Sequence, residues 1–368
     1  MKQSAAFCMH LCDVLKLLFF LLNLYTFVSC ILQINLNMQV LKKLLTPSLE
    51  WLVLPILISA LLWFLPALFG VAYSQESYPF QLLGSFTWFT LPAGWAQVIQ
   101  FVFQIVIGVI LMQWCERWQL IPVRSAIPLF VALFLMSTIA DLQFFDARTV
   151  ALMLFLLAIS QLFSMYSYNG EKVSAGFNIG FLVTSAAFFH IEYFYLIVIF
   201  LIGMIVFSTF TVRILFALLS GVFVPLFLAW SAFFLSDNLE MLFAILAQIH
   251  IDLFDVSTLE LLRSDVLFAG ILLLLFLMSL GSYFSVSLNF KLHVRLNFFF
   301  INLAFILTTI WAGFFFYKLE VLLFVPIIFL ILLLSFFFST NHSKFVNIIF
   351  CAFIVLGLAY RIINLLGF

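Results

Sequence analysis

Apolar runs of about 18 to 20 residues recur along the whole chain, and this pattern restricts its fold more than any other feature. A helix of that length crosses the hydrocarbon core of a bilayer, which is about 30 Å thick. Membrane β-barrels instead alternate apolar and polar residues over segments of about 10 residues. The runs here are continuous, so the sequence predicts an all-α, polytopic integral membrane protein.

The composition agrees with a lipid environment. The chain is 67% hydrophobic and 8% charged, with a mean hydropathy of +1.30, whereas a soluble domain is about 25% charged. A chain with so few charges cannot cover itself with polar residues, so the lipid bilayer is its first expected partner. We find no glycine-rich phosphate loop and no GxSxG nucleophile motif. No nucleic-acid partner is expected, and the cofactor is unknown.

The first 37 residues differ from the rest. Lys16 precedes an apolar run, LLFFLLNLYTFVSCIL, that could be a signal peptide or a short anchor. A start codon assigned too early would also explain residues 1–37. Met38 is followed by a short basic segment and an apolar run, so we favour Met38 as the start of a single multi-span domain, residues 38–368.

The apolar runs after Met38 predict eleven membrane-spanning helices, or twelve if residues 14–32 are retained as a helix. Their ranges are 49–71, 95–114, 126–140, 147–166, 175–189, 193–211, 214–235, 266–286, 296–316, 321–338 and 345–363. Two of them, 126–140 and 175–189, are about 15 residues long, or about 22 Å of helix. Because this is shorter than the hydrocarbon core, we expect each to thin the bilayer, to use flanking residues, or to end in a protein-lined cavity.

Basic residues are distributed unequally between the two predicted sides of the membrane. One side holds nine: Lys42, Lys43, Arg117, Arg124, Lys172, Arg213, Lys291, Arg295 and Lys344. The other side holds four: Arg148, Arg263, Lys318 and Arg361. Because Lys and Arg are retained on the cytoplasmic side, the N-terminus of the Met38 form is predicted in the cytoplasm and the C-terminus outside.

Most carboxylates lie on the predicted outer side, in three kinds of connection. The first, residues 72–95, is long and aromatic and contains Glu76; its middle is expected to lie along the bilayer or re-enter it. Two short connections read DLQFFD, residues 141–146, and HIE, residues 190–192. The third, residues 236–265, has the apolar spacing of amphipathic helices on the outer surface.

These connections supply the candidate site residues. The carboxylates that could act as a base or metal ligand at a membrane surface are Glu76, Asp141 and Asp146. The candidate binding residues are Arg148, His190, Glu192, Asp252, Asp255 and Arg263. Carboxylates with basic phosphate partners at the outer face suit a polyprenyl-phosphate-linked sugar as substrate. The bland alternative is that these residues are turn tips and solvated helix faces.

No metal site is predicted. Cys8, His10 and Cys12 make an incomplete zinc site. The remaining histidines split evenly across the membrane, with His190 and His250 outside and His293 and His342 inside, so they cannot build a four-histidine centre. Gly176 and Gly180 are four residues apart in one predicted span, a spacing that favours close helix packing.

Several segments are similar to known proteins. TPSLEWLVLPILISALLWFLP, RWQLIPVRSAIPLFVALFL and ALMLFLLAISQLFSMYSYNGEKVSAGFNIGFLVTSAAFF, followed by SGVFVPLFLAW, span roughly residues 40–235. Through them the chain resembles an uncharacterised family of multi-span inner-membrane proteins from Bacteroidota. The resemblance implies an inner-membrane location and a start at Met38, and it implies no catalytic residue.

A looser similarity concerns multi-span glycosyltransferases of the C-type fold. Glu76 stands where those enzymes have an acidic residue in the first outer connection. Their paired Asp-Asp or Asp-Glu is absent from SQESYP, which puts catalysis by Glu76 in doubt. The sharpest functional hypothesis is a role in envelope glycan or lipid-linked precursor assembly. A transporter or a non-catalytic assembly subunit is the alternative, and the sequence does not decide whether the chain is an enzyme.

Overall fold

The computed structural model describes residues 49–68, 77–82, 86–121, 125–143, 145–167, 172–237, 263–286, 290–314, 324–341 and 343–366. The predictions made for residues 1–37, including the helix at 14–32 and the Cys8, His10 and Cys12 group, lie outside this part of the chain. So does most of the predicted amphipathic segment, residues 236–265.

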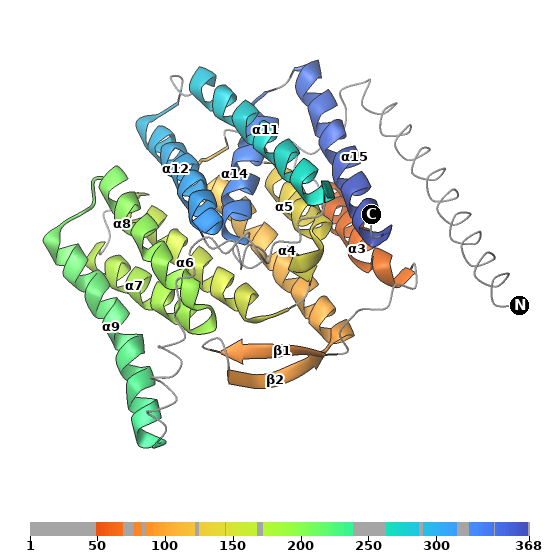
Figure 1. Ribbon diagram of the computed structural model, residues 1–368. Helices are drawn as coiled ribbons and strands as arrows, with labels where there is room; N and C mark the ends of the chain where they lie inside the picture. The colour runs from red at the N-terminus through yellow and green to blue at the C-terminus, as the bar shows by residue number, and fades with distance from the viewer. Residues whose placement is uncertain are drawn as a thin grey trace, which may run out of the picture.

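Helices dominate the described residues (Figure 1). They are α3 (Leu49–Leu68), α4 (Ala93–Arg117), α5 (Ile127–Thr138), α6 (Ala147–Ser167), α7 (Lys172–Phe189), α8 (Ile197–Val206), α9 (Val212–Leu235), α11 (Arg263–Val286), α12 (Leu292–Phe314), α14 (Phe324–Thr340) and α15 (Lys344–Leu366). Two short 3-10 helices, η1 (Ala140–Gln143) and η2 (Ile191–Leu196), lie in connections.

Each predicted span coincides with one of these helices, with ends shifted by a few residues. Within the described residues, seven helices are long and apolar enough to cross a membrane, and four shorter apolar helices accompany them. The chain is therefore an all-α, multi-pass membrane protein, as predicted.

The lengths of the short helices differ from the prediction. α5 has 12 residues, so it is shorter than predicted. α7 begins at Lys172 and has 18 residues, so the prediction of a span of about 15 residues there is wrong. The short helix in that region is its successor α8, which has 10 residues and follows η2. Because η2 already uses the first residues of the apolar run, few remain for α8.

The first long connection contains a β-hairpin that the sequence did not predict. β1 (Ser77–Leu82) pairs with β2 (Phe86–Pro92) in antiparallel register, from Ser77 opposite Pro92 to Leu82 opposite Phe86, with an irregularity between Phe80 and Gln81. β2 leads directly into α4. We call the end of the bundle where this hairpin lies the hairpin end, and the end where α7 and α9 begin the opposite end (Figure 1).

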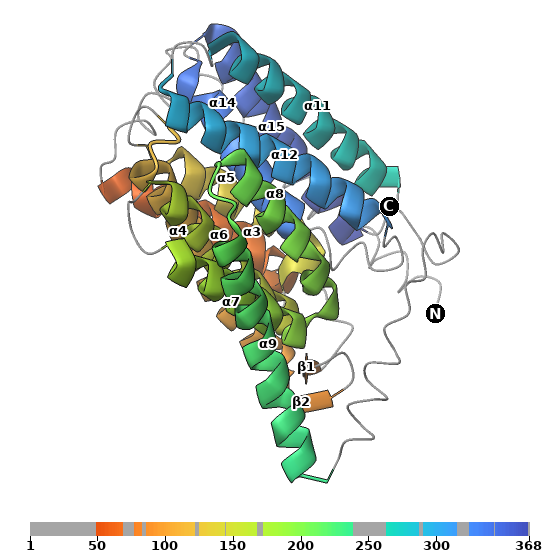
Figure 2. The ribbon, with the colours of Figure 1, turned by 90° about the vertical axis from the view of Figure 1, so that its left-hand side faces the viewer.

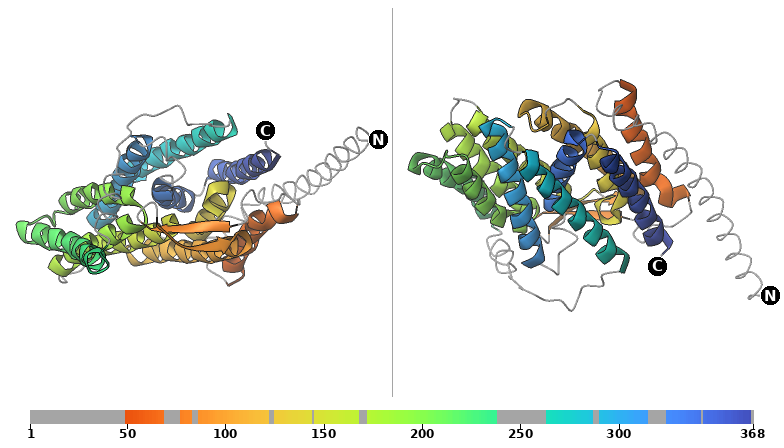
Figure 3. Two further views of the ribbon diagram at one scale, coloured as in Figure 1. Left: turned by 60° about the horizontal axis from the view of Figure 1, so that its bottom comes forward. Right: turned by 90° about the horizontal axis from the view of Figure 1, so that it is seen from above.

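Two helices form the centre of the bundle. Every residue of α5 is buried, and so is every residue of α14 up to Ser339. α14 packs against α5, α11, α12 and α15, and Figure 3 shows it between α9 and α3, which lie at opposite edges. The helices around α5 and α14 therefore cover both of them on all sides.

α7 and α9 are held together by glycines. A Cβ placed on Gly180 would lie 2.2 Å from the carbonyl oxygen of Leu218, and one on Gly221 would lie 2.1 Å from that of Phe177. A Cβ placed on Gly176 of α7 would lie 3.2 Å from the carbonyl oxygen of Ile214 in α9. The close packing predicted from Gly176 and Gly180 is confirmed, since backbone atoms of α9 lie within 3.2 Å of a Cβ placed at either position.

α9 lies at the edge of the bundle, and its second half extends past the hairpin (Figure 2). Only 22% of the apolar stretch of α9 is buried inside the protein. Its aromatic residues Phe223, Phe227, Trp230 and Phe234 are exposed and form a ladder of ring contacts. Apolar surface of this size is stable when it faces lipid.

Candidate functional site

The connection between α5 and α6 folds against the start of α4 at the hairpin end. The backbone N–H of Phe145 donates to the carbonyl oxygen of Ala96 at 3.2 Å. The Gln100 side chain donates to the Leu142 carbonyl oxygen at 3.0 Å and accepts from the Thr149 hydroxyl at 2.8 Å. Because all these groups are buried or nearly so, their hydrogen bonds fix the backbone on both sides of residue 146.

Asp146 and Arg148 form an ion pair at this place. Arg148 Nε donates to Asp146 Oδ2, and the backbone N–H of Thr149 donates to Asp146 Oδ1 at 3.3 Å. The Arg148 guanidinium also lies over the ring of Phe324, 5.7 Å from its centroid, at the start of α14. The two charged side chains are 17% and 21% exposed, so the pair is partly shielded and accessible to a ligand.

A second pair of polar side chains lies at the start of η2. His190 Nδ1 is paired with Glu192 Oε2. The Glu192 side chain is only 3% exposed, and a buried carboxylate requires such a partner to offset its lost hydration. The sequence predicted that His190 and Glu192 lie in a short connection between two helices, and η2 is part of that connection.

Tyr193 connects the two pairs. Its side chain is fully buried, and within the described residues its hydroxyl has no hydrogen-bond partner. The hydroxyl lies close enough to Asp146, Arg148 and Glu192 to interact with their charges. We call Asp146, Arg148, His190, Glu192 and Tyr193 the tip cluster. A buried hydroxyl without a partner is rare and costs stability, which marks the tip cluster as a candidate binding site.

A hydrogen bond between distant parts of the chain supports the tip cluster from the side. Arg361 of α15, only 2% exposed, donates to Gln143 Oε1 at 2.6 Å. Gln143 Nε2 in turn donates to the Ser137 carbonyl oxygen at 2.9 Å. The last helix is thereby fastened to the connection that holds Asp146.

These contacts confirm the predicted alternation of sides. Arg361, Asp146 and Glu192, all predicted on one side, lie at the hairpin end. At the opposite end, the Tyr283 hydroxyl donates to the Arg295 carbonyl oxygen at 3.2 Å, and the Asn341 amide donates to Ser282 at 2.7 Å. Which end faces the cytoplasm stays a prediction.

Four of the predicted site residues meet in the tip cluster: Asp146, Arg148, His190 and Glu192. Asp141 lies in η1 of the same connection, and its side chain is not described. Arg263 is the first residue of α11, also without a described side chain. Glu76, Asp252 and Asp255 lie outside the described residues. The role of each as a catalytic or binding residue stays a prediction.

Metal binding finds no support in this region. Among the residues that the structure describes, no three His, Cys, Asp or Glu side chains are grouped so that they could hold a metal ion. Glu192 and Asp146 are each paired with a basic side chain, so the tip cluster offers charged and hydroxyl groups to a polar ligand.

Sequence reasoning missed three residues here: Tyr193, Gln143 and Arg361. Tyr193 stood in an aromatic run, IEYFY, where nothing distinguishes one ring from the next. Arg361 was assigned to the correct side, but its partner is 218 residues away in the chain. Only the neighbouring polar residues of the 141–146 connection could have pointed to Gln143.

Comparison with protein-family models, with curated proteins and with solved structures gave no match for this chain. The resemblance to a family from Bacteroidota and the looser one to C-type-fold glycosyltransferases therefore stay predictions from the sequence. The tip cluster is the feature of the molecule that bears most directly on function.

Proposed function

We propose that the chain is an inner-membrane protein of the bacterial envelope that handles a lipid-linked glycan precursor, with the tip cluster as the place where the precursor binds. The observation that carries the proposal is the buried Tyr193 hydroxyl, which has no hydrogen-bond partner among the described residues, in the same region as the Asp146–Arg148 and His190–Glu192 pairs. A polyprenyl-phosphate-linked sugar offers both a phosphate and hydroxyl groups, and these are the partners such a cluster can accept.

Arg148 is the phosphate-binding residue in this proposal. A guanidinium binds phosphate through paired, charge-assisted hydrogen bonds. In the absence of substrate its partner is Asp146. A phosphate that binds Arg148 in place of Asp146 would free the Asp146 carboxylate. The carboxylate could then accept a proton from a sugar hydroxyl.

Tyr193 and Glu192 would orient the sugar. The Tyr193 hydroxyl can donate to or accept from a sugar hydroxyl. The free energy lost by leaving this hydroxyl without a hydrogen bond in the free protein would then be recovered when the sugar binds. Glu192, which is paired with His190, supplies a second acceptor.

Transport is the second candidate, and it is less well supported. A central pathway needs a cavity between helices, whereas α5 and α14 are buried on all sides in the described part of the chain. Gln104 and Asn297, whose side-chain amide atoms are buried without hydrogen-bond partners in this part, are features that favour a polar path. A non-catalytic assembly subunit would leave the tip cluster unexplained.

The test is a glycan profile of cells in which the chain is replaced by variants. Asp146→Asn, Arg148→Gln and Tyr193→Phe are compared with Asp237→Asn, an exposed carboxylate at the end of α9 where the backbone φ of 54° suits Asn. Glu76→Gln and Asp141→Asn test the remaining predicted carboxylates. We expect altered surface glycans for the tip-cluster variants and none for Asp237→Asn. Unchanged glycans in the Asp146, Arg148 and Tyr193 variants, at equal protein levels, would refute the proposal.

A further inference from the structure

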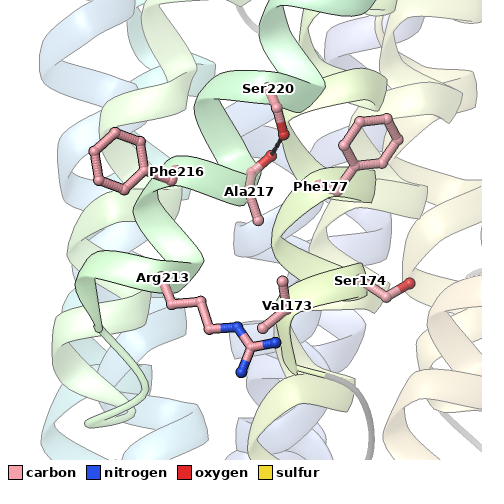
Figure 4. Close-up of a pocket in the computed structure, with 7 residues that line it drawn as sticks. All are labelled: Val173, Ser174, Phe177, Arg213, Phe216, Ala217 and Ser220. Carbon is pink, nitrogen blue, oxygen red and sulfur yellow. Dashed lines mark hydrogen bonds between the residues drawn. The ribbon is translucent and has the colours of Figure 1, made fainter.

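A groove at the opposite end of the bundle lies between α7 and α9. Its volume is about 780 Å³, and the residues that line it include Val173, Phe177, Arg213 and Phe216. Figure 4 shows Arg213 extending from the first turn of α9 toward Val173 at the start of α7. The glycine contacts further along hold α7 and α9 together, and these contacts fix the distance between the two helices that line the groove.

The groove is positively charged at its mouth. Arg213 is exposed, and the ion pairs found among the described residues, Arg148–Asp146 and His190–Glu192, do not include it. Lys172, also exposed, is the first residue of α7. Both helices begin at this end and run in the same direction, so their positive dipole ends add to the two side-chain charges. The mouth of the groove is therefore complementary to an anion.

A second groove at this end provides a contrast. It lies between α4 and α6, has a volume of about 520 Å³, and is lined by both Glu116 and Arg117. Its two opposite charges cancel, so it offers no comparable attraction to an anion. The charged residue that lines the α7–α9 groove is Arg213, and no carboxylate accompanies it among the described lining residues.

The walls of the α7–α9 groove are largely apolar, with Val173, Phe177, Phe216 and Ala217 beside Ser174 and Ser220. The Phe216 side chain is 67% exposed, and Phe177 stands on the α7 wall. α9 is the least buried of the long apolar helices of the described chain. A soluble anion would gain nothing from such walls, whereas the acyl chains of a lipid would pack against them.

We propose that the α7–α9 groove binds an anionic phospholipid, with its phosphate on Arg213 and its acyl chains along Phe177 and Phe216. Basic pockets between membrane helices on the cytoplasmic side suit such headgroups, and the Lys and Arg distribution predicts that this end faces the cytoplasm. The groove is at the other end of α7 from the tip cluster, so this inference does not depend on the proposed function.

The test is native mass spectrometry of the purified full-length chain, titrated with phosphatidylglycerol or phosphatidylcholine. We expect one phosphatidylglycerol to bind at lower concentration than phosphatidylcholine. Arg213→Gln should weaken phosphatidylglycerol binding about tenfold, because a charge-assisted phosphate contact is lost. Arg213→Lys should keep most of the affinity, and Phe216→Ala should weaken both lipids by a few-fold.

Two controls separate the groove from general surface charge. Arg117→Gln removes a cation from the second groove and should leave lipid binding unchanged. Glu171→Gln removes the carboxylate just before α7, which lies outside the described residues, and should not weaken phosphatidylglycerol binding. Size-exclusion profiles and melting temperatures equal to those of the wild type show that each variant is folded.

Three results would overturn the inference. The first is equal affinity for the two lipids, and the second is unchanged phosphatidylglycerol binding by folded Arg213→Gln. The third is displacement of the lipid by inorganic phosphate at the concentration at which phosphatidylglycerol binds, which would indicate a site for a soluble phosphate.

Discussion

The α5–α14 pair and the α7–α9 pair solve the same packing problem in opposite ways. α5 and α14 are buried on every side, and large rings such as Phe134 and Phe329 fill the space around them. α7 and α9 instead touch backbone to backbone through Gly180 and Gly221. In lipid there is little hydrophobic drive between helices, so both pairs depend on close contact of atoms. In the central pair, large side chains make that contact. In the lateral pair, glycines allow the two backbones to touch.

The largest expected effect is the loss of a central ring. Phe329 is fully buried in α14 and meets Phe155 of α6 edge to face at 6.5 Å. Phe329→Ala should lower the free energy of unfolding by about 3–5 kcal/mol, since the cavity cannot close around a rigid neighbour. Denaturation by SDS in bicelles measures this. Phe223→Ala, at an exposed ring of α9, should cost little, and equal losses in the two variants would contradict the assignment of α14 to the centre.

Adding one methyl group tests the lateral pair. A Cβ on Gly180 would lie 2.2 Å from the Leu218 carbonyl oxygen and 3.0 Å from the Val222 nitrogen, both backbone atoms. Gly180→Ala should therefore force α7 and α9 apart and cost about 1–3 kcal/mol in the same assay. Gly270→Ala is the matched control, because nothing lies within 4 Å of a Cβ there. The idea fails if the two alanine variants unfold alike.

Gly203 shows whether backbone contact is what matters. A Cβ on Gly203 of α8 would approach Leu162 at 2.6 Å and Phe300 at 2.8 Å, but only at the ends of their side chains. Because side-chain atoms yield more readily than backbone atoms, we expect Gly203→Ala to cost about 1 kcal/mol, the lower end of the range for overpacking. A larger loss at Gly203 than at Gly180 would show that ring packing, rather than backbone contact, limits helix approach.

The smallest effect is expected at Tyr193 of η2. Its ring contacts Phe155, which also contacts Phe329, and its hydroxyl is buried without a partner in the described chain. Tyr193→Phe should raise the free energy of unfolding by up to about 1 kcal/mol, since an unsatisfied polar group is removed. The same variant is expected to impair the glycan phenotype. A loss of stability instead would mean that the hydroxyl has a partner in the folded protein.

The helices were predictable because span prediction uses local information. Each apolar run in the sequence became a helix, and the residues at the tips, Asp146, Arg148, His190 and Glu192, were placed at one end by alternation alone. The pairing of Gly180 with the α9 backbone was predicted only in part: the spacing of Gly176 and Gly180 indicated close packing but not the partner helix. The β-hairpin was missed because its residues, SYPFQL and FTWFTLP, also suit a membrane interface.

The sequence alone determined that this protein is a multi-pass helical membrane protein, and which residues lie at the same end of the bundle. Hydrophobicity and charge decide these properties residue by residue, so they need no knowledge of neighbours. Only the tertiary structure decided that α14 is central, that Arg361 reaches Gln143, and that the Tyr193 hydroxyl is buried without a partner in the described chain. Such contacts depend on how helix surfaces interlock, and interlocking is a property of pairs of helices rather than of any one segment.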